Sequence, residues 1–237
     1  MCVVDSAPDA ANLREIERRL PGVAEDTRQK LGPWLERAKR IQTQQPKDKN
    51  KLYALHAPEV ECIGKGKAHR AYAFGVKVPV ATSLHRSAGG QFVAHIKSQP
   101  GAPYDGHTLA ALIPEMEEQL GTTINRIIAD RGYRGHNAPS THQFKVYIAG
   151  QKRRVTDAIK RELRRRPAVE PVIGHLKEDN RMGRNFLSHA AGDAINAILA
   201  AAGYNFRRVL AWLKLLCAWF ILLMTLNRSQ NYQPDCA

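Results

Sequence analysis

The chain has 237 residues, of which 43% are hydrophobic and 24% charged, the balance of an ordinary globular protein. Its 36 lysines and arginines outnumber 22 acidic residues, and the resulting net charge of +14 favours a polyanionic partner, nucleic acid before an acidic membrane surface. The four cysteines form no CxxC pair and the first residues show no secretory signal, so a zinc site, a disulfide framework and export are not expected.

Two charged helices are predicted in the first 46 residues. The first covers 11–20, where apolar residues recur at helical spacing, and Pro21-Gly22 ends it. The second covers 25–45 and has its apolar residues on one side. A polar, proline-containing connector over 44–51 follows, so this helical segment is expected to stand apart from the core.

From residue 52 the sequence takes on the pattern of β-strands. Alternating apolar residues from Tyr72 to Val80 predict one half-buried strand. The next segment, after the Gly89-Gly90 turn, is expected to pair with it. Besides this partner strand over 91–100, the apolar spacing predicts three further elements: a helix over 105–121 and strands over 122–130 and 145–150.

After residue 150 the chain is predicted to be helical nearly to its end, over 156–166, 167–180 and 193–216. Together with the preceding strands, this order predicts an α/β fold in which helices pack on a mixed sheet. Residues 209–226 are almost wholly apolar, yet short for a membrane span and interrupted by Lys214. A buried or oligomer-forming helix is therefore favoured there, and a membrane helix is the alternative.

Asp130 is the first candidate for a functional site. It ends the predicted strand 122–130 and is followed by Arg131, Gly132 and Arg134. A carboxylate at the carboxyl end of a buried strand lies where α/β sheets bind ligands, and glycine lets the backbone approach a ligand closely. The alternative is an ordinary turn, which the same residue types also form.

Glu170 is the second candidate. Arg166, Glu170 and Lys177 would lie within about 40° of one another on a continuous helix. A carboxylate between two cations stays ionised, which suits a metal ligand beside a phosphate site. The alternative is an exposed, salt-bridged helix face. Pro167 and Pro171 also permit the helix to restart at this point, which would break the stripe.

Three basic segments, 65–70, 152–166 and 181–185, could follow a phosphate backbone, or could simply keep the surface soluble. Asp105 is predicted to cap a helix that begins near His107.

Five blocks of sequence resemble, in order and spacing, the bacterial insertion-sequence transposases of the DDE type, and most of all the fourth and fifth insertion-sequence families. The blocks are EVECIGKGKAHRAYAFGVKV, PYDGHTLAALI, IIADRGYRGH, VEPVIGHLKEDNRMGRNFL and GDAINAILAAAGYNFRRVLAWLKLL, within residues 47–216. The resemblance implies an RNase H-like fold. It also implies two Mg²⁺ ions held by two aspartates and a glutamate.

Carried over residue by residue, Asp130 corresponds to the second acid and Glu170 to the third. Arg166 and Lys177 match the spacing of a Tyr–Arg–Glu–Lys pattern whose cations would contact DNA phosphates, although Leu163 stands at the tyrosine position.

Arg131 and Arg134 are further candidates for DNA contact. The first acid has only Asp5 as a candidate metal ligand, and the residues after it differ from the family pattern. An N-terminally truncated copy is therefore expected.

Three domains are expected: a helical remnant over 1–46, an RNase H-like catalytic domain over 47–208, and an apolar helix with a divergent tail over 209–237. The implied function is metal-dependent DNA cleavage and strand transfer on transposon ends and target DNA. The alternative is a non-catalytic DNA-binding remnant that modulates a full-length transposase. Either would work in the bacterial cytoplasm at the nucleoid, with a homo-oligomer left open and no membrane partner expected.

Overall fold

The computed structural model describes residues 9–67, 69–85 and 90–230. The chain divides into two compact units, each formed by segments that are distant in the sequence. Unit 1 comprises Met1–Pro79, Lys97–Pro103 and Gly183–Ala197; unit 2 comprises Val80–Ile96, Tyr104–Met182 and Ile198–Ala237. Each unit draws on three separate stretches of chain.

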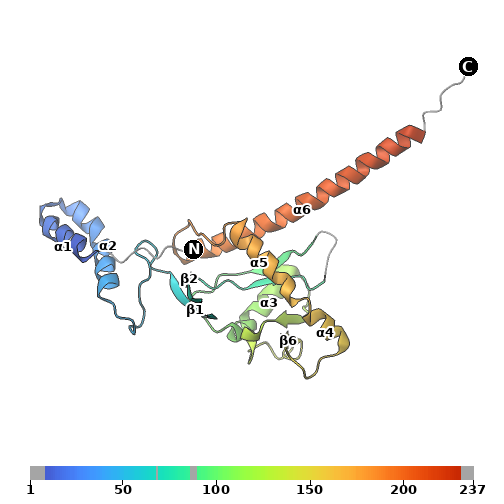
Figure 1. Cartoon of the computed structure of the whole chain (residues 1–237), viewed down its shortest axis with the longest axis horizontal. Coiled ribbons are helices and arrows are strands. Elements are labelled where there is room, and N and C mark those ends of the chain that lie inside the picture. Colours follow the sequence, from blue (N-terminus) through green and yellow to red (C-terminus); the bar gives the residue numbers. More distant parts are fainter. Residues whose placement is uncertain (1–8, 68, 86–89, 231–237) are drawn as a thin grey trace, which may run out of the picture. The chain divides into compact units, whose positions relative to one another are not determined.

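Unit 1 contains the predicted helical hairpin, formed by α1 (Ala10–Arg19) and α2 (Glu25–Thr43) (Figure 1). Helix α1 begins where the Asp9 carboxylate accepts the N–H of Ala11 at 3.1 Å, as an N-cap does. A turn of 3₁₀ helix over Leu20–Gly22 ends it at the predicted Pro-Gly break. An ion pair between Glu17 and Lys39 joins the two helices.

The predicted strand from Tyr72 to Val80 is wrong as a single element. It divides into β2 (Arg70–Gly75) and β3 (Val80–Thr82). Gly75 has a φ of 131°, which only glycine adopts readily, and Pro79 has no N–H to offer a ladder. Consequently β2 pairs with β1 (Glu61–Lys67) in unit 1, while β3 belongs to unit 2.

The strands of unit 2 form two small sheets. Strand β3 pairs antiparallel with β4 (Val93–Ile96), and β5 (Ile127–Ala129) pairs parallel with β6 (Val146–Ile148). The mix of helices and strands is as predicted. The single mixed sheet is not found among the described residues, where all three sheets have two strands.

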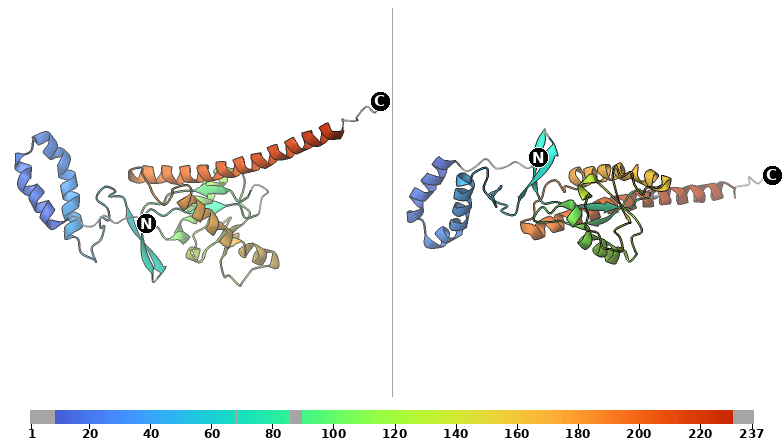
Figure 2. Two further views of the ribbon diagram at one scale, coloured as in Figure 1. Left: turned by 45° about the horizontal axis from the view of Figure 1, so that its top comes forward. Right: turned by 90° about the horizontal axis from the view of Figure 1, so that it is seen from below.

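Helices cover the strands of unit 2 on two sides (Figure 2). The helices involved are α3 (Leu109–Leu120), α4 (Asp157–Leu163), α5 (Val169–Glu178) and the long α6 (His189–Gln230), which enters this unit at Ile198. Successive strand residues face opposite ways, so Val80 packs with α5 and α6 while Ala81 packs with α3. The strands therefore lie between two hydrophobic clusters.

Each cluster is dominated by residues from helices. The first joins Val172 and Leu176 of α5 to Ala200, Ala201 and Tyr204 of α6, over Val93. The second joins Leu109, Leu112, Ile113 and Met116 of α3 to Ala129 and Val146. Because β5 and β6 pack on α3, the position of α3 fixes the end of β5, where the first candidate acid lies.

Replacement of Ile113 by alanine should destabilise unit 2 by about 2–5 kcal/mol, because the side chain is 0% exposed and its loss leaves a cavity. The matched control is Ile198→Ala, also helical but 56% exposed, which should change stability by less than about 0.5 kcal/mol. Urea unfolding followed by circular dichroism measures both. Equal losses would contradict the core assignment.

Candidate functional site

Asp130 lies at the carboxyl end of β5, as predicted. Its Oδ1 accepts the N–H of Arg131 at 2.7 Å and so caps a 3₁₀ turn over Arg131–Tyr133. The turn interpretation is thus correct for one carboxylate oxygen. The other oxygen, Oδ2, forms an ion pair with a residue outside the turn. Turn formation does not require this second contact.

That partner is Arg166, whose guanidinium bridges the two predicted acids. Its Nη2 lies 2.8 Å from Asp130 Oδ2 and its Nη1 lies 3.0 Å from Glu170 Oε1. The arginine side chain is 24% exposed, against 52% and 56% for the acids. Two carboxylates far apart in the sequence therefore meet on one cation at the surface of unit 2, with oxygen atoms open to solvent.

The helix does restart beside Glu170. Arg166 begins a 3₁₀ turn over Arg166–Ala168, and α5 follows from Val169. Pro167 and Pro171 fall in first turns, where an N–H would have no helical partner anyway. The pair Arg166–Glu170 survives this restart as an i,i+4 contact. Lys177 is exposed on α5 and joins no ion pair of the described chain, so only part of the predicted stripe is assembled.

The turn after Asp130 is held against the segment before α3. The hydroxyl of Tyr104 donates to the carbonyl of Arg134 at 2.8 Å. Asn137 donates from its backbone to Gly106 O at 2.9 Å and from its amide to His107 O at 2.7 Å, and its Oδ1 accepts Ala110 N–H at 3.0 Å. Asn137 was missed by sequence reasoning, because its only local signal is that of a turn residue.

The DNA contacts of Arg131 and Arg134 stay a prediction, and the two side chains have different surroundings in the structure. The Arg131 side chain packs over Gly150, with Nε 3.5 Å from the position a Cβ would take there. The Arg134 side chain is exposed, and its backbone carbonyl is occupied by Tyr104. Both arginines are close to Asp130 in the sequence. The Arg131 side chain also packs on Gly150 in the loop after β6.

Asp105 does not cap α3, which begins four residues later at Leu109. The N-cap residue is Thr108, whose hydroxyl donates to the carbonyl of Asp105 at 2.7 Å. The Asp105 carboxylate instead faces Gly132, where an added Cβ would lie 2.9 Å from Oδ2. A side chain at position 132 would therefore force the Asp105 carboxylate to move away.

Tyr133 is a second residue that sequence reasoning missed. Burial raises the pKa of its phenol above the ordinary value, and the negative charges of Asp105 and Asp130 raise it further, while a hydrogen bond with Thr108 acts in the opposite direction. The phenol is therefore neutral at physiological pH. It places a polar O–H, without charge, among the carboxylates.

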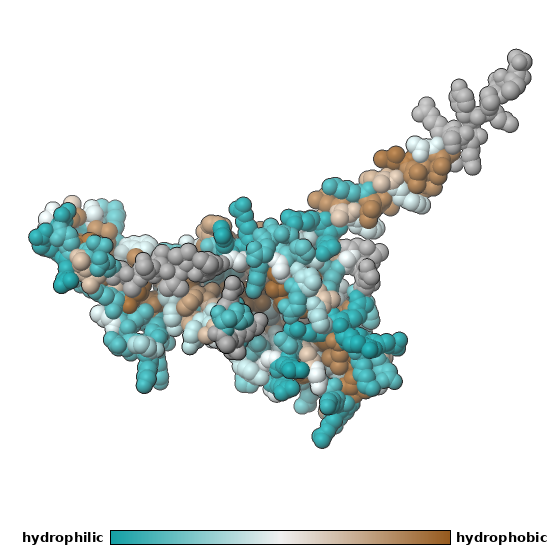
Figure 3. All heavy atoms as spheres, in the orientation of Figure 1, coloured by the Kyte–Doolittle hydropathy of each residue, from teal (hydrophilic) through white to brown (hydrophobic). Residues whose placement is uncertain are grey.

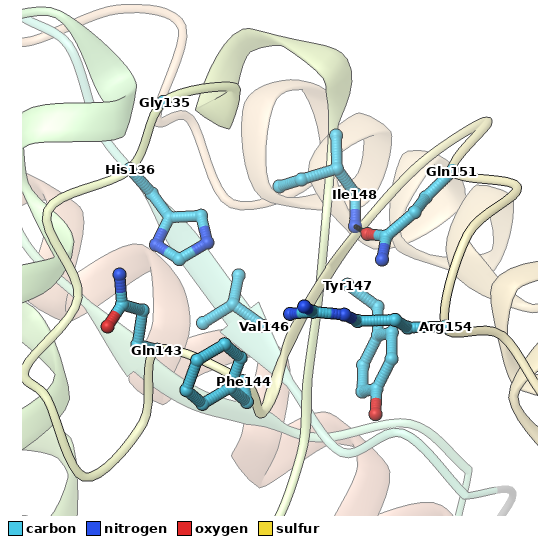
Figure 4. Close-up of a pocket in the computed structure, with 9 residues that line it drawn as sticks. All are labelled: Gly135, His136, Gln143, Phe144, Val146, Tyr147, Ile148, Gln151 and Arg154. Atoms are coloured by element: carbon cyan, nitrogen blue, oxygen red, sulfur yellow. Dashed lines mark hydrogen bonds between the residues drawn. The ribbon is translucent and has the colours of Figure 1, made fainter.

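A cavity of about 300 Å³ opens beyond Gly135, at the end of the same turn (Figure 4). Its apolar wall is formed by Phe144, Val146, Tyr147 and Ile148. The Arg154 guanidinium points toward the Phe144 ring, 5.3 Å from its centroid. The candidate acids are not part of this wall, so the cavity is a neighbouring feature with an aromatic and cationic character.

The site fits a divalent cation in part. Asp130 and Glu170 already converge on a positive group, and exposed carboxylate oxygens are the hard ligands that Mg²⁺ prefers. The described residues include no group of three histidine, cysteine or acidic side chains placed to share an ion. Asp5, the remaining candidate ligand, lies outside the described residues.

Comparison of the chain with protein-family models, with curated proteins and with solved structures finds no match in any of the three.

Tyr133→Phe should lower the free energy of unfolding by about 1 kcal/mol near neutral pH, because a partly buried hydrogen bond is lost. Above about pH 10 the unfolded phenol releases its proton while the folded one retains it, so the wild type loses stability as pH rises. The variant lacks this loss, and the gap between the two proteins should close. Urea titrations from pH 7 to 11 measure it. Parallel curves over that range would contradict the assigned environment.

Proposed function

We propose that unit 2 is the catalytic domain of a DNA transposase that cleaves DNA and transfers strands with the help of Mg²⁺. The observation that carries the proposal is the meeting of Asp130 and Glu170 on Arg166. Each acid also stands in a local sequence pattern that suits a ligand, Asp130 after an apolar strand and Glu170 between two cations. A shared metal and phosphate site requires the two acids to lie close together. Two unrelated surface acids would have no reason to do so.

The order of elements in unit 2 supports an RNase H-like interpretation. An antiparallel strand pair, β3–β4, is followed by α3, then by β5 with an acid directly after it, then by β6 parallel to β5, and finally by α5 with the second acid. Acids placed at a strand end and on a later helix can converge only if the helix packs beside that strand end, as α5 does through Arg166.

Phosphodiester cleavage and transfer need positioned cations more than covalent chemistry from the protein. Asp130 and Glu170 would hold Mg²⁺, which when bound polarises the phosphate and makes water or a 3′-hydroxyl a better nucleophile. Arg166, once released by either acid, has a planar guanidinium suited to a phosphate. Lys177, Arg131 and Arg134 would add positive charge along the DNA.

The residues around the acids would keep this arrangement fixed. Tyr133 offers a neutral O–H that does not compete with the carboxylates for a cation. Gly132 allows the Asp105 carboxylate to approach the turn, and Asn137 ties the turn to the start of α3. A transposase acting on DNA in this way would work in the bacterial cytoplasm, at the nucleoid.

A second candidate is a DNA-binding protein without cleavage activity that modulates a complete transposase. One observation favours it: the described residues bring two acids together, whereas the resemblance implies three. Arg166 offsets one of the two carboxylate charges in the structure, so binding of phosphates without a metal would rely on the other cations of the surface, Lys177, Arg131 and Arg134.

The test is cleavage of DNA that flanks the gene, using the purified full chain with Mg²⁺. Asp130→Asn and Glu170→Gln should each lower the rate on the order of a hundredfold or more, because several kcal/mol of charge stabilisation are lost. Asp157→Asn is the matched control, since Asp157 is an acid of the same unit that is 91% exposed and paired only locally with Lys160.

Three outcomes separate the two candidates. Cleavage that needs Asp130 and Glu170 but not Asp157 supports the transposase. DNA binding without cleavage by the wild type supports the modulating protein. Absence of both binding and cleavage rejects the two together.

Lys177→Ala should weaken DNA binding about equally on all sequences, since an exposed lysine would contact phosphate rather than bases. The slope of log K against log salt should fall by about 0.9 for one lost contact. Fluorescence anisotropy at several salt concentrations measures the slope. Lys39→Ala, which removes a lysine already paired with Glu17 in unit 1, should leave it unchanged.

A further inference from the structure

In the part of the chain that the structure describes, the side chains of the C-terminal part of α6 are not buried. Residues 209–226, here called the apolar segment, contain large hydrophobic side chains that are all exposed (Figure 3). These are Val209, Leu210, Trp212, Leu213, Leu215, Leu216, Trp219, Phe220, Ile221, Leu222, Leu223, Met224 and Leu226. A helix buried in the chain's own core, which the sequence favoured, is therefore not what the structure contains.

The apolar segment lacks a continuous polar face. At 100° per residue, large side chains point in nearly every direction, and only Lys214 and Thr225 are polar. The Thr225 hydroxyl is satisfied within the helix, donating to Leu222 O at 2.8 Å. A helix that is apolar all round needs apolar surroundings on all sides. One partner helix would cover a single side and leave the others in water.

The dimensions of the apolar segment suit a bilayer. Eighteen helical residues rise about 27 Å, close to the roughly 30 Å of hydrocarbon in a membrane. Its backbone groups are paired within a continuous helix, as lipid requires. The single charged side chain, Lys214, lies near one end, from which a long lysine can reach the headgroups.

The charges next to the segment fit the same environment. Arg207 and Arg208 directly precede it, where Arg207 pairs with Asp179 at 3.2 Å and Arg208 lies over the Tyr204 ring. The packed part of α6 thus ends just before the apolar segment, at two arginines. Trp212 lies near that boundary, where indole rings favour the membrane interface. The net charge of +14 adds attraction to anionic lipids.

We propose that the apolar segment of α6 inserts into a phospholipid bilayer and anchors the protein, with Arg207 and Arg208 at the headgroups. By the distribution of these charges, the folded part of unit 2 lies on the cytoplasmic side. This inference does not depend on the proposed transposase function. It is compatible with it, since DNA is reached from that same side.

The experiment is flotation of the purified full chain with vesicles of phosphatidylethanolamine and phosphatidylglycerol, and separately with vesicles of phosphatidylcholine alone. The wild type should float with both and stay bound in high salt. Leu222→Lys, with a charge near the centre of the segment, should reduce partitioning about a hundredfold. Leu199→Lys is the matched control, the same change at an exposed position of α6 before the segment, and should float as the wild type does.

A second measurement needs no substitution in the apolar segment. Brominated lipids should quench Trp212 and Trp219, while Trp34 in α2 of unit 1 should stay unquenched, as a Trp34→Phe comparison shows. Flotation with anionic vesicles only, reversed by salt, would overturn insertion in favour of surface charge binding. Lipid-free oligomers that Leu222→Lys dissociates would overturn it in favour of a second copy of the chain.

Discussion

The candidate site depends on one interaction, the Arg166 guanidinium held between two carboxylates. Without a cation, Asp130 and Glu170 would repel each other at the surface, and the turn after β5 would lose its ion-pair link to α5. The guanidinium has parallel N–H groups that can satisfy two acids at once, which a lysine ammonium does less well. Arg166 therefore holds the two acids together when no metal is bound. It also takes up the negative charge that the two acids would otherwise offer to a metal ion.

This arrangement makes Arg166 a competitor as well as a partner. A divalent ion that binds both acids must displace the guanidinium from at least one of them. The freed cation then lies next to the metal, where a phosphate would be attracted to both. A surface pair of this exposure is weak enough to be exchanged, since ion pairs in water contribute little net stability.

Local patterns made Asp130 and Glu170 candidates, since one follows an apolar strand and the other lies between cations at helical spacing, but left a turn and a salt-bridged face as alternatives. The Arg166–Glu170 contact is itself local. The contacts of Tyr133 and Asn137 are not, because they join the turn after β5 to the segment before α3, and no periodicity in the sequence encodes such a pairing. The strand from Tyr72 to Val80 was mispredicted for a related reason. Apolar side chains continue to alternate across Gly75 and Pro79, but the backbone does not continue there as a single strand.

Asn137 has a consequence for how this sequence can vary. Its backbone N–H, its side-chain amide and its side-chain carbonyl each bind a different backbone group between Gly106 and Ala110. Aspartate would set an oxygen against the carbonyl of His107, and glutamine would be too long for the same three bonds. Position 137 should therefore remain asparagine among related chains while the side chains of residues 106–110 vary, because its partners there are backbone groups rather than side chains.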